Sequence, residues 1–159
     1  MSEVIYCCFL PTVKNDTDRI TSLTVRGTLQ KKSQEFSINF VNNPTNTDNI
    51  TYQFKMEIPK QKIVETHKKE GKWSNTEKET YLNGSAGDSI SHTDTEFFLE
   101  FVFNYKNSTI RVNRVVDGNE GKGYNHICEY DTLFDLFEIQ AVQIWGDVKK
   151  ILTFTMKYD

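Results

Sequence analysis

The chain has 159 residues, a formal net charge of −3 and 37% apolar residues, and it carries eleven Phe, seven Tyr and two Trp. That many large rings argues against disorder, since each can bury roughly 150–250 Å² on folding. Charges of both signs are interleaved without a basic stripe, and no apolar run approaches the roughly 20 residues that span a bilayer, so we expect neither nucleic-acid binding nor membrane insertion.

Apolar and polar residues alternate along most of the chain, which is the pattern of β-strands with one buried face. The clearest stripe consists of Ile50, Tyr52, Phe54, Met56 and Ile58. Strands are expected, in chain order, at 4–10, 23–29, 35–41, 50–58, 62–66, 77–82, 97–105, 109–112, 137–145 and 149–157, and a helical turn only within 132–137. Turn-forming residues separate them at 42–44, 69–71, 83–84, 117–118 and 121–123. Roughly nine to eleven short strands in this order indicate an all-β sandwich or barrel.

Three cysteines, Cys7, Cys8 and Cys128, give an odd count. Neighbouring residues of a strand point to opposite faces, so at most one of Cys7 and Cys8 can reach Cys128. We expect free thiols in a reducing compartment, and the spacing of cysteines and histidines suggests neither a zinc site nor another cofactor. The apolar segment 4–10 is too short for a signal peptide and no basic segment precedes it, which predicts a cytoplasmic protein.

Several segments, taken in order, resemble one known family. The first third contains LTVRGTL at 23–29 and EFSINF at 35–40, and the middle contains IVETHKKEGKW at 63–73. The last third contains FLEFVF at 98–103, TIRVN at 109–113, GYNHI at 123–127, LFEI at 136–139 and VQIWGDV at 142–148. In order and spacing these segments resemble the galectins, the β-galactoside-binding lectins, over about residues 10–156.

The resemblance implies one domain over residues 1–159, with its core at about 10–156 and an N-terminal edge strand at 1–10. The implied fold is all-β: a galectin-type (jelly-roll, concanavalin A-like) antiparallel β-sandwich of two sheets. The distance from Asn113 to Tyr124 is longer than in the family and predicts a loop insertion, and His126 is expected to shape a turn. The alternative is an unrelated sandwich such as a carbohydrate-binding module, which would lack the Tyr-Asn-His and Gly-Asp-Val segments.

The resemblance also implies where a sugar would bind. Galectins hold the sugar with a His-x-Asn-x-Arg strand, an Asn on the next strand and a Trp-Gly-x-Glu-x-Arg loop. The corresponding residues of this chain are Gln53, Lys55, Glu57, Thr66, Trp73, Glu77 and Lys78, with His67 in place of Thr66 if the register slips by one residue. Only Trp73 keeps both type and place, since Glu77 comes one place late and Lys78 takes the place of the Arg. The alternation within 50–58 separately puts the first three of these residues on the exposed face of their strand.

These replacements predict a β-galactoside affinity that is weakened or altered. Arg offers a rigid planar set of donors that Lys does not reproduce, and Glu offers no donor. Each partner lost from such a network costs about 1–3 kcal/mol. Trp73, flanked by charged residues and Gly71, is expected to be an exposed stacking platform rather than a ring packed against the sheet rim. The polar residues are equally compatible with a solvated strand face, and Glu77 and Lys78 with cross-strand charge pairs.

We therefore expect a galectin-like lectin domain that binds a glycan without catalysis and without a metal. Catalysis by Glu57 with Glu77 or Glu79 is disfavoured, because no spacing singles out a carboxylate pair. The alternative function is a galectin-fold module that has lost sugar binding and acts by protein association. For that case the resemblance implies homodimers that pair through the terminal strands, here 4–10 and 151–158. It also implies an unconventional route by which a cytoplasmic protein reaches the cell exterior.

Overall fold

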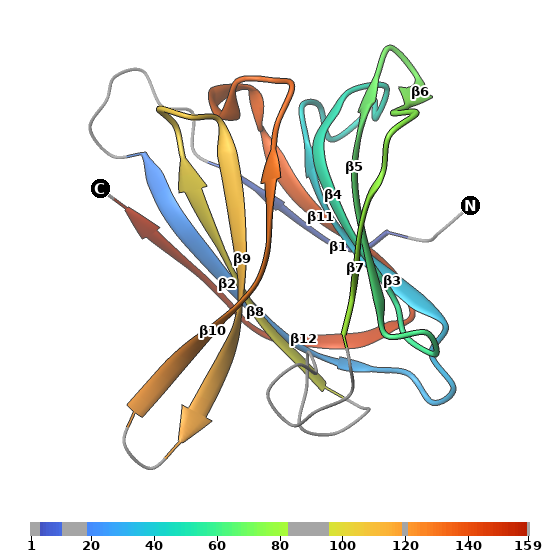
Figure 1. Cartoon of the computed structure of the whole chain (residues 1–159), viewed down its shortest axis with the longest axis vertical. Helices are drawn as coiled ribbons and strands as arrows, with labels where there is room; N and C mark the ends of the chain where they lie inside the picture. Colours follow the sequence, from blue (N-terminus) through green and yellow to red (C-terminus); the bar gives the residue numbers. More distant parts are fainter. Residues whose placement is uncertain (1–3, 11–18, 83–95, 119–120, 159) are drawn as a thin grey trace.

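Two antiparallel β-sheets packed face to face make up the described part of the chain (Figure 1). The computed structural model describes residues 4–10, 19–82, 96–118 and 121–158. The seven-stranded sheet contains, in spatial order, β1 (Val4–Phe9), β11 (Ala141–Gly146), β3 (Glu35–Val41), β4 (Ile50–Glu57), β5 (Lys62–Lys69) and β6 (Lys72–Trp73), with β7 (Lys78–Tyr81) also paired to β5. The five-stranded sheet contains β10 (Gly121–Asp131), β9 (Thr109–Gly118), β8 (Glu96–Asn104), β2 (Ile20–Leu29) and β12 (Val148–Tyr158). The predicted antiparallel β-sandwich of two sheets is confirmed.

The apolar core lies between the two sheets and is rich in aromatic rings. Alternation along each strand turns every second side chain inward. The ring centroids of Phe36 and Phe97 are 4.6 Å apart, and those of Phe54 and Phe101 are 5.6 Å apart, so both pairs join one sheet to the other. All four rings are at most 1% exposed. Burial of each such side chain stabilises the fold by about 1.5–3 kcal/mol.

Each strand expected from the alternation overlaps an observed strand, but the one expected at 137–145 begins only at Ala141. A 3₁₀ turn, η1 (Leu136–Glu138), occupies its first residues. The turn is fixed by a capping box, in which the Asp135 carboxylate accepts a hydrogen bond from the Phe137 N–H (3.1 Å) and the Glu138 carboxylate accepts one from the Asp135 N–H (3.0 Å). Within the described ranges no helix is long or apolar enough to cross a membrane.

The described residues between Asn113 and Tyr124, where a loop insertion was expected, belong to two paired strands. β9 continues to Gly118 and β10 begins at Gly121, and the two strands are paired to Thr109 and Asp131 with one register shift between His126 and Cys128. His126 lies within β10 opposite Asn113, exposed and next to a register shift, so the prediction that it shapes a turn was wrong. The expected turn at 83–84 lies outside the described residues.

Candidate functional site

A groove of about 550 Å³ crosses the outer face of the seven-stranded sheet, on the side that faces away from the core. Its walls and floor come from β1, β3, β4, β5, β6 and β11, from the connection between β3 and β4, and from the residue preceding β7. The lining residues are Val4, Glu35, Phe36, Ser37, Pro44, Thr47, Gln53, Lys55, Thr66, Lys68, Trp73, Glu77, Gln143 and Trp145.

The floor of the groove is a row of polar side chains on adjacent strands. The strand registers place Gln143 opposite Asn39, Asn39 opposite Gln53, and Gln53 opposite Thr66. The side-chain amide of Gln53 donates to Asn39 Oδ1 (2.8 Å), and the amide of Asn39 donates to the Gln143 carbonyl (3.3 Å) and to Ser37 Oγ (2.9 Å). These bonds hold the amide groups in fixed orientations before any ligand arrives.

The same polar residues are far less exposed than a solvated strand face. Gln53 is 7% exposed and Thr66 is 3% exposed. The alternation correctly places Gln53 on the outer face, but it does not reveal that neighbouring side chains cover most of it. Buried polar groups must have partners. Gln53 finds its partner in Asn39, whereas the Thr66 hydroxyl donates to the main-chain carbonyl of His67 (3.5 Å), and the row forms a preformed pocket floor.

Trp73 stands at the rim of the groove and is 40% exposed. It follows the turn between β5 and β6, where Glu70 and Gly71 both have positive φ angles (52° and 81°). Two hydrogen bonds tie this turn to the connection between β3 and β4: the Gly71 N–H donates to the Asp48 carbonyl (2.9 Å) and the Glu70 N–H donates to Asn49 Oδ1 (2.9 Å). The ammonium group of Lys68 lies 5.2 Å from the centroid of the Trp73 ring, within cation–π distance.

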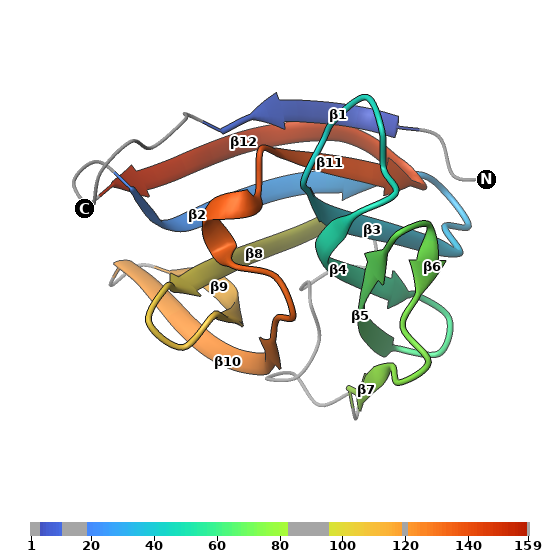
Figure 2. The same ribbon diagram turned by 90° about the horizontal axis from the view of Figure 1, so that it is seen from above.

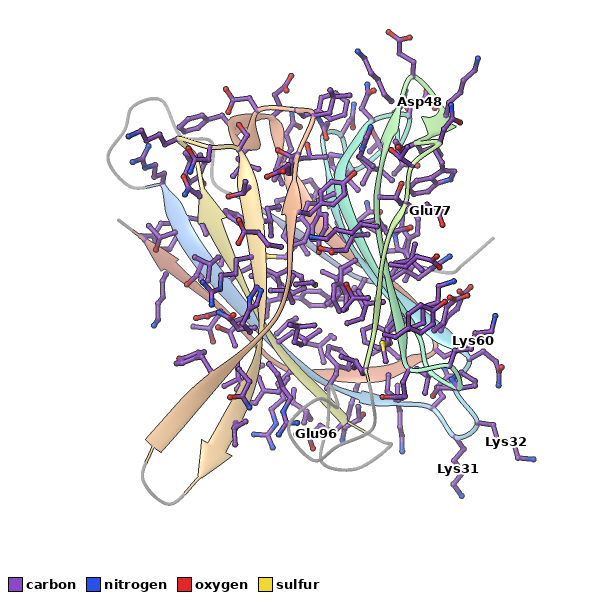
Figure 3. The ribbon with its side chains drawn as sticks, in the orientation of Figure 1. Lys31, Lys32, Asp48, Lys60, Glu77 and Glu96 are labelled. Atoms are coloured by element: carbon purple, nitrogen blue, oxygen red, sulfur yellow. The ribbon has the colours of Figure 1, made fainter. Side chains whose placement is uncertain are left out.

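Five of the seven residues that the sequence assigns to sugar binding line the groove, and two do not. Those that line it are Gln53, Lys55, Thr66, Trp73 and Glu77, and Figure 3 shows Glu77 on the outer side of the sheet.

The two residues that lie apart from the groove lining are Glu57 and Lys78. A Glu57 carboxylate oxygen lies 3.5 Å from the ammonium group of Lys62, which also pairs with Glu79. Lys78 lies opposite Glu65, whose side chain is buried between the sheets, and its ammonium group donates to the Glu129 carbonyl on β10. Directly opposed residues on neighbouring strands point to the same face of a sheet. Lys78 therefore points to the inner side, as Glu65 does.

Six lining residues with charged, amide, hydroxyl or aromatic side chains were not predicted from the sequence: Glu35, Ser37, Thr47, Lys68, Gln143 and Trp145. Trp145 is the second of only two tryptophans in the chain, and both line the groove. The alternation of β11 contains the signal, since Gln143 and Trp145 share one face while Val142 and Ile144 are fully buried.

A separate polar cluster lies on the other face of β5, between the sheets. The Tyr52 hydroxyl donates to the Glu65 carboxylate, and both residues are fully buried. Burial raises the pKa of Glu65 and also raises the pKa of the nearby Cys128 thiol. His67 Nδ1 lies 2.7 Å from the Tyr130 hydroxyl oxygen, and burial lowers the pKa of His67. These contacts connect β4 and β5 to β10 and leave the groove untouched.

The described residues contain no group of three or more His, Cys, Asp or Glu side chains that could hold a metal ion. The cysteines Cys7, Cys8 and Cys128 are free thiols in the structure. The lining of the groove itself offers aromatic faces, amides, hydroxyls and charges of both signs.

Comparison with known proteins agrees with this fold. The sequence pattern of the galactoside-binding lectin family matches residues 9–154. Among solved structures, sheep galectin-11 in complex with glycerol has a TM-score of 0.67 and 14% identity, with 96% of this chain and 95% of that chain covered. Chicken galectin 2 has a TM-score of 0.64 and 14% identity, with 98% and 100% covered. No curated protein sequence matches the chain. On the match to the family pattern over residues 9–154, the chain belongs to the galactoside-binding lectins, the galectins.

Proposed function

We propose that this galectin-type lectin domain binds a glycan without catalysis in the groove on the outer face of the seven-stranded sheet, with a β-galactoside affinity that is weakened or altered. The observation that carries the proposal is the pairing of an exposed Trp73 with a floor of pre-oriented amides in one groove. An aromatic face suits the apolar C–H surface of a sugar ring, and amides and hydroxyls suit its hydroxyl groups.

The altered specificity follows from what stands at the galactose-binding positions. Gln53, Lys55 and Thr66 line the groove where family members use His, Asn and Asn. The two positions that carry Arg in the family hold Glu57 and Lys78, which have no guanidinium group. Both side chains are also engaged elsewhere, because Glu57 is paired with Lys62 and Lys78 points toward β10. The loss of several donors, at about 1–3 kcal/mol each, leaves little of an affinity built on that network.

The test is a titration read by tryptophan fluorescence, first with lactose and then with a glycan panel. Both tryptophans line the groove, so a fluorescence change reports on this site. We expect little response to lactose, a saturable response to another glycan, and loss of that response in Trp73→Ala. Tyr124→Ala is the control, because Tyr124 is an exposed aromatic residue on β10, far from the groove lining.

Two outcomes would overturn the proposal in different ways. Lactose binding as strong as that of an unaltered galectin would show that the replaced residues rebuild a galactose site. If no glycan of the panel changed the fluorescence, the proposed lectin function would be rejected, and the alternative function described next would be favoured.

The alternative function is association through the terminal strands. β1 and β12 are edge strands of the two sheets, and they run side by side in Figure 2. The rings of Tyr6 on β1 and Phe154 on β12 contact each other across this edge, with their centroids 5.5 Å apart. Phe9 is 68% exposed and Leu152 is 42% exposed. Unpaired edge strands with exposed apolar side chains are templates for pairing with a second chain.

A further inference from the structure

We infer that Trp145 forms a second stacking platform at the opposite end of the groove, so that the site takes an extended, neutral glycan rather than a single terminal sugar. The inference rests on the proposed glycan-binding function and adds to it the length and the charge class of the ligand.

The Trp145 side chain is held in one orientation. Its indole N–H donates to Gln143 Oε1 (3.0 Å), and the Gln143 amide in turn donates to the Pro44 carbonyl (3.0 Å). Gln143 is only 4% exposed, so this chain of bonds is anchored in the floor of the groove. A ring that is fixed before binding loses little conformational entropy when a ligand stacks on it.

The ring of Trp145 also rests on apolar side chains that are separate from the main core. Val41, Ile50 and Ala141 form a small buried cluster, and Trp145 packs against it. Because the indole N–H is already bonded within the protein, the part of the ring that lines the groove offers an apolar surface. That surface matches the C–H face of a sugar ring, as the exposed face of Trp73 does.

The two platforms are too far apart for one sugar ring. Trp145 lies on β11 and Trp73 on β6, and β3, β4 and β5 lie between them. Four strand intervals at about 4.8 Å each separate the two backbones by roughly 19 Å across the sheet. The polar row of Gln143, Asn39, Gln53 and Thr66 crosses the space between them. A ligand that contacts both tryptophans must therefore be an oligosaccharide whose middle units lie over this row.

The charges of the described lining balance. Lys55 and Lys68 carry positive charge, and Glu35 and Glu77 carry negative charge. A groove with two charges of each sign provides no net field to concentrate an anionic or a cationic ligand. Hydroxyl groups, in contrast, can accept from the lysines and donate to the carboxylates. The site therefore favours a neutral glycan over a sulfated or sialylated one.

The test is a glycan array that carries β-galactosides, β-linked N-acetylglucosamine, mannose and β-glucan chains, each as di-, tetra- and hexasaccharides and with sulfated versions. For the backbone that binds, we expect the neutral hexasaccharide to bind about three- to tenfold more tightly than the disaccharide, which is the gain of one additional stacking contact. Trp145→Ala should reduce this ratio to about one, whereas Trp145→Phe should keep part of it because a ring remains. Tyr124→Ala is the control, and it should keep the full ratio.

The possible results separate this inference from the function on which it rests. Equal affinity for short and long chains, or a length dependence that survives Trp145→Ala, would overturn the second platform while leaving glycan binding in place. Preference for the sulfated chains would overturn the assignment of a neutral ligand. Failure of the wild-type protein to bind any glycan at any length would reject the proposed function together with the inference. Melting curves of each variant show whether a loss reflects unfolding, and the wild-type length series stands without any variant.

Discussion

Gly146 has a backbone conformation, and main-chain neighbours, that leave no room for a side chain. Its φ angle is +102°, and an added Cβ would lie 2.6 Å from the Glu35 carbonyl oxygen and 2.8 Å from Phe36 Cα. The residue lies directly after Trp145 at the corner between β11 and β12, where the Asp147 carboxylate accepts hydrogen bonds from the Gln34 and Glu35 N–H groups (2.8 and 3.3 Å). The close atoms are all main-chain atoms of Glu35 and Phe36, which cannot move aside as a flexible side chain would, so the corner does not admit a Cβ without a shift of the backbone.

Gly146→Ala should therefore lower the free energy of unfolding by about 2–4 kcal/mol. Gly123→Ala is the matched control, since a Cβ there would meet its nearest neighbours on Val116 at an ordinary 3.9 Å. That control should change the stability by less than about 1 kcal/mol. Denaturant unfolding of the two variants measures the difference, and equal stability would show that the corner is not strained.

The buried Glu65 carboxyl makes stability depend on pH in a predictable direction. Burial raises its pKa, and the titratable groups around it are Tyr52 on β4, Lys78 on β7, and Cys128 and Glu129 on β10, of which Glu129 also raises it. A carboxyl whose pKa is higher in the folded than in the unfolded state stabilises the fold fully only below its unfolded pKa of about 4.3. That contribution is lost as the pH rises through the raised folded value.

Glu65→Gln removes this titration while keeping the shape of the side chain. Relative to the wild type, the variant should gain stability as the pH rises from 4 to 8. Thr66→Val, on the opposite face of the same strand, is a nontitrating control whose effect should stay constant over this range. Thermal unfolding at several pH values measures both differences. A Glu65→Gln effect that does not change with pH would mean that the carboxyl ionises equally in the folded and unfolded protein.

At the scale of single elements, β1 is the part of the structure on which the alternative function depends. It pairs with β11 along one side, and no other strand of the described residues pairs with its second side. If two chains associate through this edge, Phe9→Lys should shift the protein toward the monomer, since an exposed charge on an edge strand opposes pairing. Sedimentation over the micromolar range measures this shift, with Tyr124→Lys as an exposed aromatic control on β10. A wild-type protein that stays monomeric throughout would contradict association through β1.

The strands were predictable from the sequence because their information is local. Alternation identifies β4 almost to its ends, with Ile50, Tyr52, Phe54 and Met56 fully buried as expected. β10 was missed, because Tyr124, Asn125 and His126 are all exposed and leave no period-two signal there. β10 is held by its hydrogen-bonded pairing with β9, and a local sequence pattern does not show which strands pair.

The sequence predicted the Trp73 end of the groove but not the Trp145 end. The Trp73 end follows one hairpin, so the family resemblance could place it. The Trp145 end depends on the spatial neighbourhood of β11 and β3 and on the Pro44 carbonyl, which are brought together only by the fold. The inward orientation of Lys78 likewise depends on the β5–β7 register rather than on its position in the sequence.

In the whole molecule, the two faces of the seven-stranded sheet have different roles. Its inner face contributes to the aromatic core and, at Glu65, to the polar cluster beside β10. Its outer face carries the amide row between the two tryptophans. If a glycan binds on the outer face as proposed, the core need not change, and we expect the bound and free backbones to differ little.

The most direct test of the central claim is a two-dimensional ¹⁵N–¹H spectrum recorded while the best-binding neutral oligosaccharide of the panel is added. The chain has two indole N–H groups, and both belong to the groove. We expect both indole signals and the backbone signals of Gln53 and Thr66 to shift together with one dissociation constant. Shifts confined to the five-stranded sheet, with the two indole signals unmoved, would contradict it.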